Sequence, residues 1–405
     1  MTDSTNQECT VKARGSKSYL NALVAVISVA ALFDFDYLRF LGLGSALYLL
    51  QLIAFALMLL LLFINKSRLD AFFVSWVVFC FWMAFCTVFN GQDLQAYARL
   101  VFKITQPMLL LYCFSDSLYM LFKVLYLYLF VLLALNLVTM ILYPDGLYTT
   151  GSLNIATENW LLGFKNKLTI YLLPFLIVTF CLIKADGFSF NTGVAISVVL
   201  LSAILSKSST AIVSIAITFL FVFISLFGKR KSLLNAQMFL AVYLVLFILI
   251  VLLRFQNLFS FLIVDVLHKD LTFTNRIYLW DVAIGAIKTS PLFGNGYLTI
   301  ASRHALYTSL SIQTAHDQIL EYGFVGGLIQ IGLFIGLNFS LARRLGSIDD
   351  WRFQQIVSAV YFAALFALLT EVFEDSLFYL IYFLLWFSPL FCSERRLLNG
   401  SIYES

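Results

Sequence analysis

The sequence predicts an all-α polytopic membrane protein with about 12 transmembrane helices. Of its 405 residues, 61% are hydrophobic and only 12% are charged, whereas an average soluble domain has roughly 25% charged residues. The apolar runs are about 20 residues long, which suits helices that cross a bilayer rather than the alternating strands of a membrane barrel. This composition excludes ordinary cytosolic enzymes, nucleic-acid binders and secreted disulfide scaffolds. We therefore expect residues 1–405 to form a single integral membrane domain in the lipid bilayer.

The apolar runs define the predicted spans in chain order. They cover 18–33, 41–64, 71–89, 98–115, 118–142, 168–183, 192–206, 209–227, 235–253, 323–341, 354–369 and 377–392. Arg99 and Lys103 weaken the prediction of the fourth span. The stretch 192–227 is too long for one straight helix, and polar residues interrupt it at 206–209. We therefore expect two short helices joined by a tight turn there.

The distribution of Lys and Arg predicts the orientation of the chain. Basic clusters at 229–231 and 343–344 are typical of cytoplasmic loops, and this orientation places both termini in the cytoplasm. Two of the predicted outward loops are long, 143–167 and 254–322. The second contains all three histidines and is the predicted catalytic loop. Basic residues in the outward loops run against the topology rule and indicate an anionic ligand, although long translocated loops also tolerate charge.

The loop 254–322 has local signals of its own. A helix is expected to begin with Thr274 or Asn275 as its cap and to end at Ser290-Pro291. Its apolar positions recur on one face, so we expect it to lie along the membrane interface with Trp280 at headgroup depth. Residues 294–296 predict a turn. Glycines at the start of span ten, Gly323, Gly326 and Gly327, permit close helix packing.

Several motifs occur in a fixed order around this loop. They are Asn275-Arg276-x3-Trp280, Pro291-Leu-Phe-Gly-Asn-Gly296 and His316-Asp-x2-Leu-Glu-x-Gly-x2-Gly-Gly327, preceded upstream by Leu162-Gly-Phe-Lys-Asn-Lys167. Over residues 155–345 the chain resembles the O-antigen ligase/polymerase superfamily, which are bacterial membrane glycosyltransferases that act on polyprenyl-linked sugars. Leu205-Ser-Lys-Ser-Ser-Thr-Ala211 resembles the Ser-Arg-x-Ala stretch of that family, but Ser209 stands where the arginine is expected, and Lys207 lies two residues earlier.

The resemblance implies a reaction and a set of site residues. A glycan would pass from an undecaprenyl-diphosphate-linked oligosaccharide to a sugar hydroxyl at the outer face of the bacterial cytoplasmic (inner) membrane. Arginine suits the diphosphate because its fork binds phosphate oxygens and keeps its charge, so Arg276 is the first candidate. Further candidate cations are Lys207, Arg254, Arg303, Lys165 and Lys167.

A general base that activates the hydroxyl near pH 7 is expected at His316. Glu321 or Asp317 would orient its ring, and Glu371 matches an acidic position of the ligase branch. His268 and His304 are expected to be inert. No metal-type spacing and no Walker-type loop occur in the sequence, so neither a metal nor another cofactor is predicted, and the diphosphate leaving group would supply the energy.

Three functions remain open from the sequence. A polymerase would join lipid-linked repeat units with inversion of the anomeric carbon, with a flippase and a chain-length regulator as its expected partners. A ligase would move finished glycan onto lipid A-core. A flippase or transporter belongs to a different class and would need charges buried at mid-span, whereas most charges here lie at the ends of spans. The element at 163–167 and the missing Ser-Arg pair favour the polymerase.

Overall fold

The computed structural model describes residues 21–65, 69–150, 157–228, 234–255, 276–307 and 314–403, with side chains to residue 391. A first helix covers Asn21–Leu32. The other helices are α2 (Asp36–Phe40), α3 (Gly44–Ile64), α4 (Ala71–Phe89), α5 (Leu94–Cys113), α6 (Leu118–Leu142), α7 (Thr169–Asp186), α8 (Phe190–Leu205), α9 (Ser209–Phe227), α10 (Ala236–Leu246), α11 (Arg276–Thr289), α12 (Ile300–Leu306), α13 (Gln318–Gly346), α14 (Trp351–Leu368) and α15 (Ser376–Tyr403). Short 3-10 turns, η1 (Ser115–Ser117) and η2 (Lys165–Leu168), precede α6 and α7, and the π-helical segment η3 (Phe247–Leu252) continues α10.

The polytopic helical architecture predicted from the sequence is confirmed. Each predicted span coincides with a helix in the described part of the chain, and seven of these helices are long and apolar enough to cross a membrane. Shorter apolar helices include α8 and the helix formed by α10 and η3. The count of about 12 spans stays a prediction, because length and composition establish only the seven.

The stretch 192–227 forms two helices, as its polar interruption indicates. α8 ends at Leu205 and α9 begins at Ser209. The Ser206 hydroxyl accepts a hydrogen bond from the backbone N–H of Ser208 at 3.1 Å, and the side chain of Ser208 caps α9. Serine caps of this kind compete with helix continuation, which explains why the chain turns here.

A small antiparallel sheet, which the sequence does not predict, lies in the loop before α7. Its strands are β1 (Tyr148–Thr150), β2 (Thr157–Trp160) and β3 (Gly163–Phe164), in the order β1-β2-β3. Gly163 has a φ of 105°, and a Cβ there would lie 2.4 Å from the carboxylate of Asp36 on α2. Only glycine fits this close approach, and it brings the following residues, 165–167, against α2.

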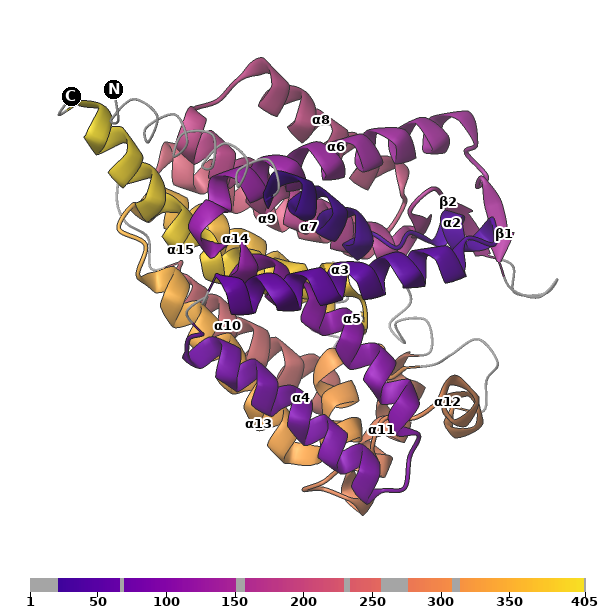
Figure 1. Ribbon diagram of the computed structural model, residues 1–405. Helices are drawn as coiled ribbons and strands as arrows, with labels where there is room; N and C mark the ends of the chain where they lie inside the picture. Colours follow the sequence, from indigo (N-terminus) through magenta and orange to yellow (C-terminus); the bar gives the residue numbers. More distant parts are fainter. Residues whose placement is uncertain are drawn as a thin grey trace.

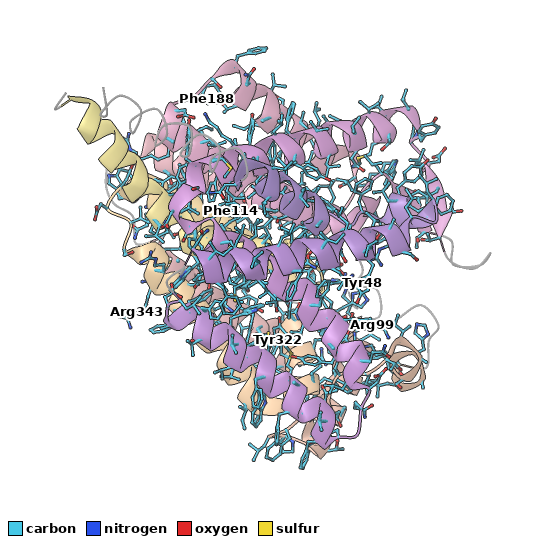
Figure 2. All side chains as sticks on the ribbon, viewed as in Figure 1. Tyr48, Arg99, Phe114, Phe188, Tyr322 and Arg343 are labelled. Atoms are coloured by element: carbon cyan, nitrogen blue, oxygen red, sulfur yellow. The ribbon has the colours of Figure 1, made fainter. Side chains whose placement is uncertain are left out.

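The helices form one packed bundle whose two ends differ. In Figure 1 the C-terminal part of α15 lies at the left, whereas α2, the sheet and α12 lie at the right. We call the first the terminal end and the second the site end. Arg343 of α13 is labelled at the terminal end in Figure 2, and Arg99 of α5 at the site end.

The bundle has a buried centre and an apolar exterior. α7 is the central helix, with 83% of its span buried, and it packs against α6, α14 and α15. α3 is peripheral, with only 17% of its span buried, and exposes Leu49, Leu60 and Phe63. A helix surface of this kind is stable against lipid but not against water.

The entry of α13 into the bundle is broken at Gly327, where φ is 68° and ψ is −165°. The loop 291–296 lies against the break and restores its backbone hydrogen bonds. Leu328 N donates to Pro291 O at 2.8 Å. Two further bonds run from the loop to α13, Asn295 N to Phe324 O at 2.7 Å and Gly296 N to Val325 O at 3.0 Å. The Pro-Leu-Phe-Gly-Asn-Gly motif thus supplies hydrogen-bond partners for the backbone of α13 around its break at Gly327.

Two glycines make this contact possible. A Cβ at Gly327 would lie 2.3 Å from the backbone of Leu292, and a Cβ at Gly294 would lie 2.6 Å from the backbone N of Gly327. Both residues have positive φ angles. A larger side chain at either position would separate the loop from α13, and with it the residues that both elements hold at the site end.

Candidate functional site

Glu371 lies at the centre of a polar cluster at the site end. It belongs to the loop 369–375 between α14 and α15 and is 8% exposed. Its carboxylate oxygens contact Asn166 of η2, Arg276 at the start of α11, and His316 just before α13. We call these four residues the Glu371 cluster. The chain thus brings three distant segments to one carboxylate.

Arg276 forms the firmest ion pair of the cluster. Its Nη2 lies 2.9 Å from Oε1 of Glu371, and the two side chains are 19% and 10% exposed. Burial of Leu279, Trp280 and Ala283 holds α11 against the bundle. This packing fixes the position of Arg276, the first residue of the helix. Charge-assisted bonds between guanidinium and carboxylate are the strong ones in proteins, so the pair orients Arg276 at the rim of the cluster.

His316 contacts the other carboxylate oxygen. Its Nδ1 lies 3.4 Å from Oε2 of Glu371, a long contact compared with an aligned hydrogen bond. The contact lacks hydrogen-bond geometry, but a proton carried on Nδ1 would face the carboxylate and would leave Nε2 as the accepting nitrogen.

The backbone of His316 is strained. Its φ is 50°, and the other described non-glycine residues with positive φ are Lys207 and Arg254. All three are candidate site residues from the sequence. Left-handed conformations cost such residues about 1–2 kcal/mol, and strain of this kind concentrates at functional sites.

Asn166 ties the cluster to the turn between α8 and α9. Its Nδ2 donates to Oε1 of Glu371 at 2.9 Å, while its Oδ1 accepts from the hydroxyl of Ser208 at 3.0 Å. The neighbouring Lys207 is exposed on the same turn. The turn that resembles the family's Ser-Arg-x-Ala stretch therefore lies at the cluster, with Ser209 at the arginine position and Lys207 two residues before it.

A second charged group surrounds Arg303 on α12, which is 5% exposed. Its Nη2 lies 2.7 Å from Oε1 of Glu374 and 3.3 Å from Oε1 of Glu321. The Tyr297 hydroxyl donates to Glu374 at 2.9 Å, and the guanidinium lies 4.7 Å from the Tyr297 ring centre. We call these four residues the Arg303 cluster. Glu321 also accepts from the backbone N–H of Ala315 at 3.2 Å, which connects this cluster to the residue before His316.

Burial and neighbouring charges set the ionisation of both clusters. Burial alone would raise the pKa of Glu371, but His316 and Arg276 outweigh it and hold that pKa below its usual value. Burial would lower the pKa of Arg303, but Glu321 and Glu374 raise it. Burial raises the pKa of Asp317 to about 8, although the backbone N–H groups of Leu320 and Ile319 oppose the shift. Near pH 7, Glu371 is therefore an anion and Asp317 a neutral acid.

The other predicted cations lie apart from Glu371 or already have partners. Lys167 Nζ lies 2.9 Å from both carboxylate oxygens of Asp36. Arg254 pairs with Asp281 of α11 and lies 5.1 Å from the ring centre of Trp280. Lys165 Nζ lies 5.9 Å from the ring centre of Phe164. Of the six basic candidates, only Arg276 is paired with Glu371 in the part of the chain that the structure describes.

One expectation from the sequence, the partner of the His316 ring, is wrong. Glu321 and Asp317 do not orient the His316 ring: Glu321 binds Arg303 and Ala315 N, and Asp317 Oδ1 caps α13 by accepting from Leu320 N at 2.9 Å. Glu371 contacts the ring instead. The Trp280 side chain is 1% exposed and packs in the core rather than against lipid, and its headgroup depth stays a prediction.

Some predictions concern residues that lie outside the described ranges, namely His268 and the caps Thr274 and Asn275. His304 lies half-buried on α12 beside Arg303. Across the described residues, no group of three or more His, Cys, Asp or Glu side chains could hold a metal ion. Cys80, Cys86, Cys113 and Cys181 are buried and form no disulfide among the described side chains.

Sequence reasoning missed several residues of the two clusters. Asn166 lies within the matched Leu162–Lys167 motif, so that motif already contained its signal. Glu374 lies in the same acidic run as Glu371. Tyr297 directly follows the Gly294–Gly296 turn and carries no comparable signal. Asp36, the partner of Lys167, lies about 130 residues upstream in sequence, and nothing in the local pattern of α2 indicates its role.

Comparison with known proteins points to the family that the motifs resemble. Residues 194–335 match a family model described as O-Antigen ligase. That range contains Arg276, Arg303 and His316, together with both glycine motifs. No curated protein matches the chain. Residues 194–335 are therefore similar to the O-antigen ligase family, and the apolar helices around them suit a membrane protein of that kind.

Proposed function

We propose that the protein is a polysaccharide polymerase that joins lipid-diphosphate-linked oligosaccharide repeat units at the outer face of the bacterial inner membrane. The observation that carries this proposal is the Glu371 cluster, in which an arginine and a histidine from two motifs meet on one buried carboxylate. The site end is assigned to the outer face because the basic residues at 343–344 lie at the opposite, terminal end. Both chain termini then lie in the cytoplasm.

Arg276 is the proposed contact for the donor diphosphate. The leaving group gains negative charge as its bond to the anomeric carbon breaks, and a fixed guanidinium at the rim of a buried site stabilises that charge better than water does. Lys207, exposed on the neighbouring turn, is a second cation for the same anion. Lys167 and Arg254 have structural roles in this proposal, because each is already paired with an aspartate.

His316 is the proposed general base. As the acceptor oxygen attacks the anomeric carbon, its proton passes to Nε2 of His316, and the diphosphate leaves with the bonding electron pair. Glu371, held as an anion, stabilises the imidazolium through Nδ1 and keeps the ring oriented. A single displacement of this kind inverts the donor's anomeric configuration, and the groups named here perform it without a metal or another cofactor.

Ligation of finished glycan to lipid A-core is the second candidate. It is favoured by the description of the matching family and by the central place of Glu371, which matches an acidic position of the ligase branch. The polymerase is preferred because Asn166, within the element that resembles polysaccharide polymerases, contacts Glu371 directly. The serine at position 209, in place of the family arginine, supports the same choice.

Purified protein in lipid nanodiscs tests this proposal. It would be incubated with lipid-diphosphate-linked repeat units in the presence of a chelator and without nucleotide sugar. The product is expected to form a ladder of chain lengths on a gel, and NMR should show an inverted anomeric linkage. A single transfer to lipid A-core without chain growth would assign the protein to the ligases, and a retained configuration would overturn the displacement mechanism.

A further inference from the structure

A polar cavity of about 420 Å³ opens at the site end, between the start of α5 and α12. This volume falls within the range of small-molecule sites. Its polar lining consists of Asp93, Arg99, Tyr297, Thr299, Arg303 and Glu374. In Figure 2 Arg99 is labelled on the part of α5 that approaches α12. The mechanism proposed above uses none of these side chains.

We propose that this cavity binds the terminal sugar of the acceptor glycan, an inference that rests on the proposed glycosyltransferase function. The charged side chains of the lining are two carboxylates and two guanidiniums, so their formal charges cancel. A diphosphate requires an excess of cations. A hydroxyl-rich saccharide without net charge instead needs donors and acceptors in balance around a partly apolar wall, and here the Tyr297 ring forms part of that wall.

The floor of the cavity is rigid. Arg303 is 5% exposed and is held by Glu374, Glu321 and the Tyr297 ring. A binding group whose position is fixed before the ligand arrives loses little entropy on binding. Arg99 and Asp93, in contrast, are exposed at the mouth of the cavity, where they can meet an entering sugar.

The position of the cavity suits an acceptor rather than the donor. Arg276 and Asn166 both contact Oε1 of Glu371, whereas His316 contacts Oε2. The Arg303 cluster joins the His316 segment through Glu321 and Ala315 N. A sugar held beside Arg303 is therefore linked to the proposed base through the Ala315 segment, whereas the proposed diphosphate contact binds the other oxygen of Glu371.

A matched pair of variants on α12 tests the proposal by direct binding. Ala301 lines the cavity and is exposed, so Ala301→Trp should fill the cavity without disturbing the core. Ala305 is exposed on the same helix but is not part of the lining, which makes Ala305→Trp the control. The probe is the oligosaccharide repeat unit released by mild acid from the lipid-linked intermediates of the same cells. It carries no diphosphate, and its affinity would be measured by microscale thermophoresis.

We expect Ala301→Trp to weaken probe binding by about tenfold or more, and Arg99→Ala to weaken it by up to about tenfold through loss of a charged donor. Ala305→Trp should bind as the wild type does. Arg276→Ala should bind the probe normally while losing polymerisation, because it acts on the donor side. Failure of the wild type to bind, or equal binding by Ala301→Trp and wild type, would overturn the acceptor site. Full polymerisation by Arg276→Ala would instead contradict the proposed function, so the two failures are distinguishable.

Discussion

Two carboxylates at opposite ends of the bundle, the half-buried Asp70 and the buried Glu371, are bound in different ways. At the terminal end, Asp70 caps α4 by accepting from the backbone N–H groups of Phe72 and Phe73 at 3.1 and 3.0 Å. It also accepts from the Tyr112 hydroxyl and from Nε1 of Trp386. All four donors are neutral groups on helices of the bundle. At the site end, Glu371 is bound by a guanidinium, an imidazole and an amide that come from loops and helix ends.

This difference separates a structural carboxylate from one suited to chemistry. Neutral donors satisfy Asp70 and fasten α4 to α5 and α15, so its role is complete within the fold. The arginine and histidine on Glu371 are groups that can bind an anion and accept a proton. We therefore expect substitutions at the site end to reduce activity with little loss of stability, and substitutions at the terminal end to do the reverse.

Arg276→Ala should have the largest effect on activity. Removing a cation that stabilises a developing phosphate charge is expected to lower the polymerisation rate by about 10³-fold or more. The protein should still insert and elute as the wild type does. Arg276→Lys should recover only part of the rate, because a point charge does not replace a bidentate fork. Gel ladders made with purified variants would measure this, and a wild-type ladder from Arg276→Ala would remove the residue from the site.

The helices and part of the site can be predicted from the sequence, whereas the rest of the site depends on tertiary contacts. The apolar runs and the serine-rich break at 206–209 predict the helices because a bilayer demands helices of a certain length. The motifs predict that Arg276 and His316 share a site. Glu371 is a candidate because it matches an acidic position of the ligase branch, but its contacts with Asn166, Arg276 and His316 are not predicted, because Asn166 and Glu371 are about 200 residues apart in sequence. The burial of Trp280 is not predicted either, because the apolar face of an amphipathic helix shows the same sequence pattern whether it packs against protein or against lipid.

His316→Ala should have the next largest effect. A positioned base contributes about 10²–10⁴-fold, so slow turnover should remain. His304→Ala and His268→Ala are matched controls within the same loop and should retain nearly the wild-type rate. Initial rates with the lipid-linked donor would show the difference. Equal rates for the His316 and His304 variants would end the assignment of His316 as base.

Asp317→Asn should have the smallest effect, confined to the pH dependence of stability. Burial raises the pKa of Asp317 to about 8 from an ordinary value of 3.8, so the folded state favours the protonated acid. Its contribution to stability is therefore fully present below the ordinary pKa and is lost as pH rises through about 8. Asparagine cannot ionise and can still cap α13.

Thermal unfolding at about pH 5 and about pH 8 checks this prediction. The Tm of Asp317→Asn, relative to that of the wild type, should be higher at the more alkaline pH. An unchanged difference between the two conditions would mean that the Asp317 carboxyl does not titrate in this window.

The most direct measurement pairs the two carboxylates. Glu371→Gln and Asp70→Asn each replace a carboxylate by its isosteric amide, and both variants would be assayed for polymerisation rate and for Tm in the same nanodiscs. Glu371→Gln should lose on the order of 100-fold in rate, because Arg276 and His316 both lose their charged partner, while its Tm stays close to that of the wild type. Asp70→Asn should keep its rate but lose about 1–3 kcal/mol of stability, because an amide N–H₂ cannot accept from Trp386. The opposite result, a stable and inactive Asp70→Asn beside an active Glu371→Gln, would contradict the assignment of the site end as the catalytic end.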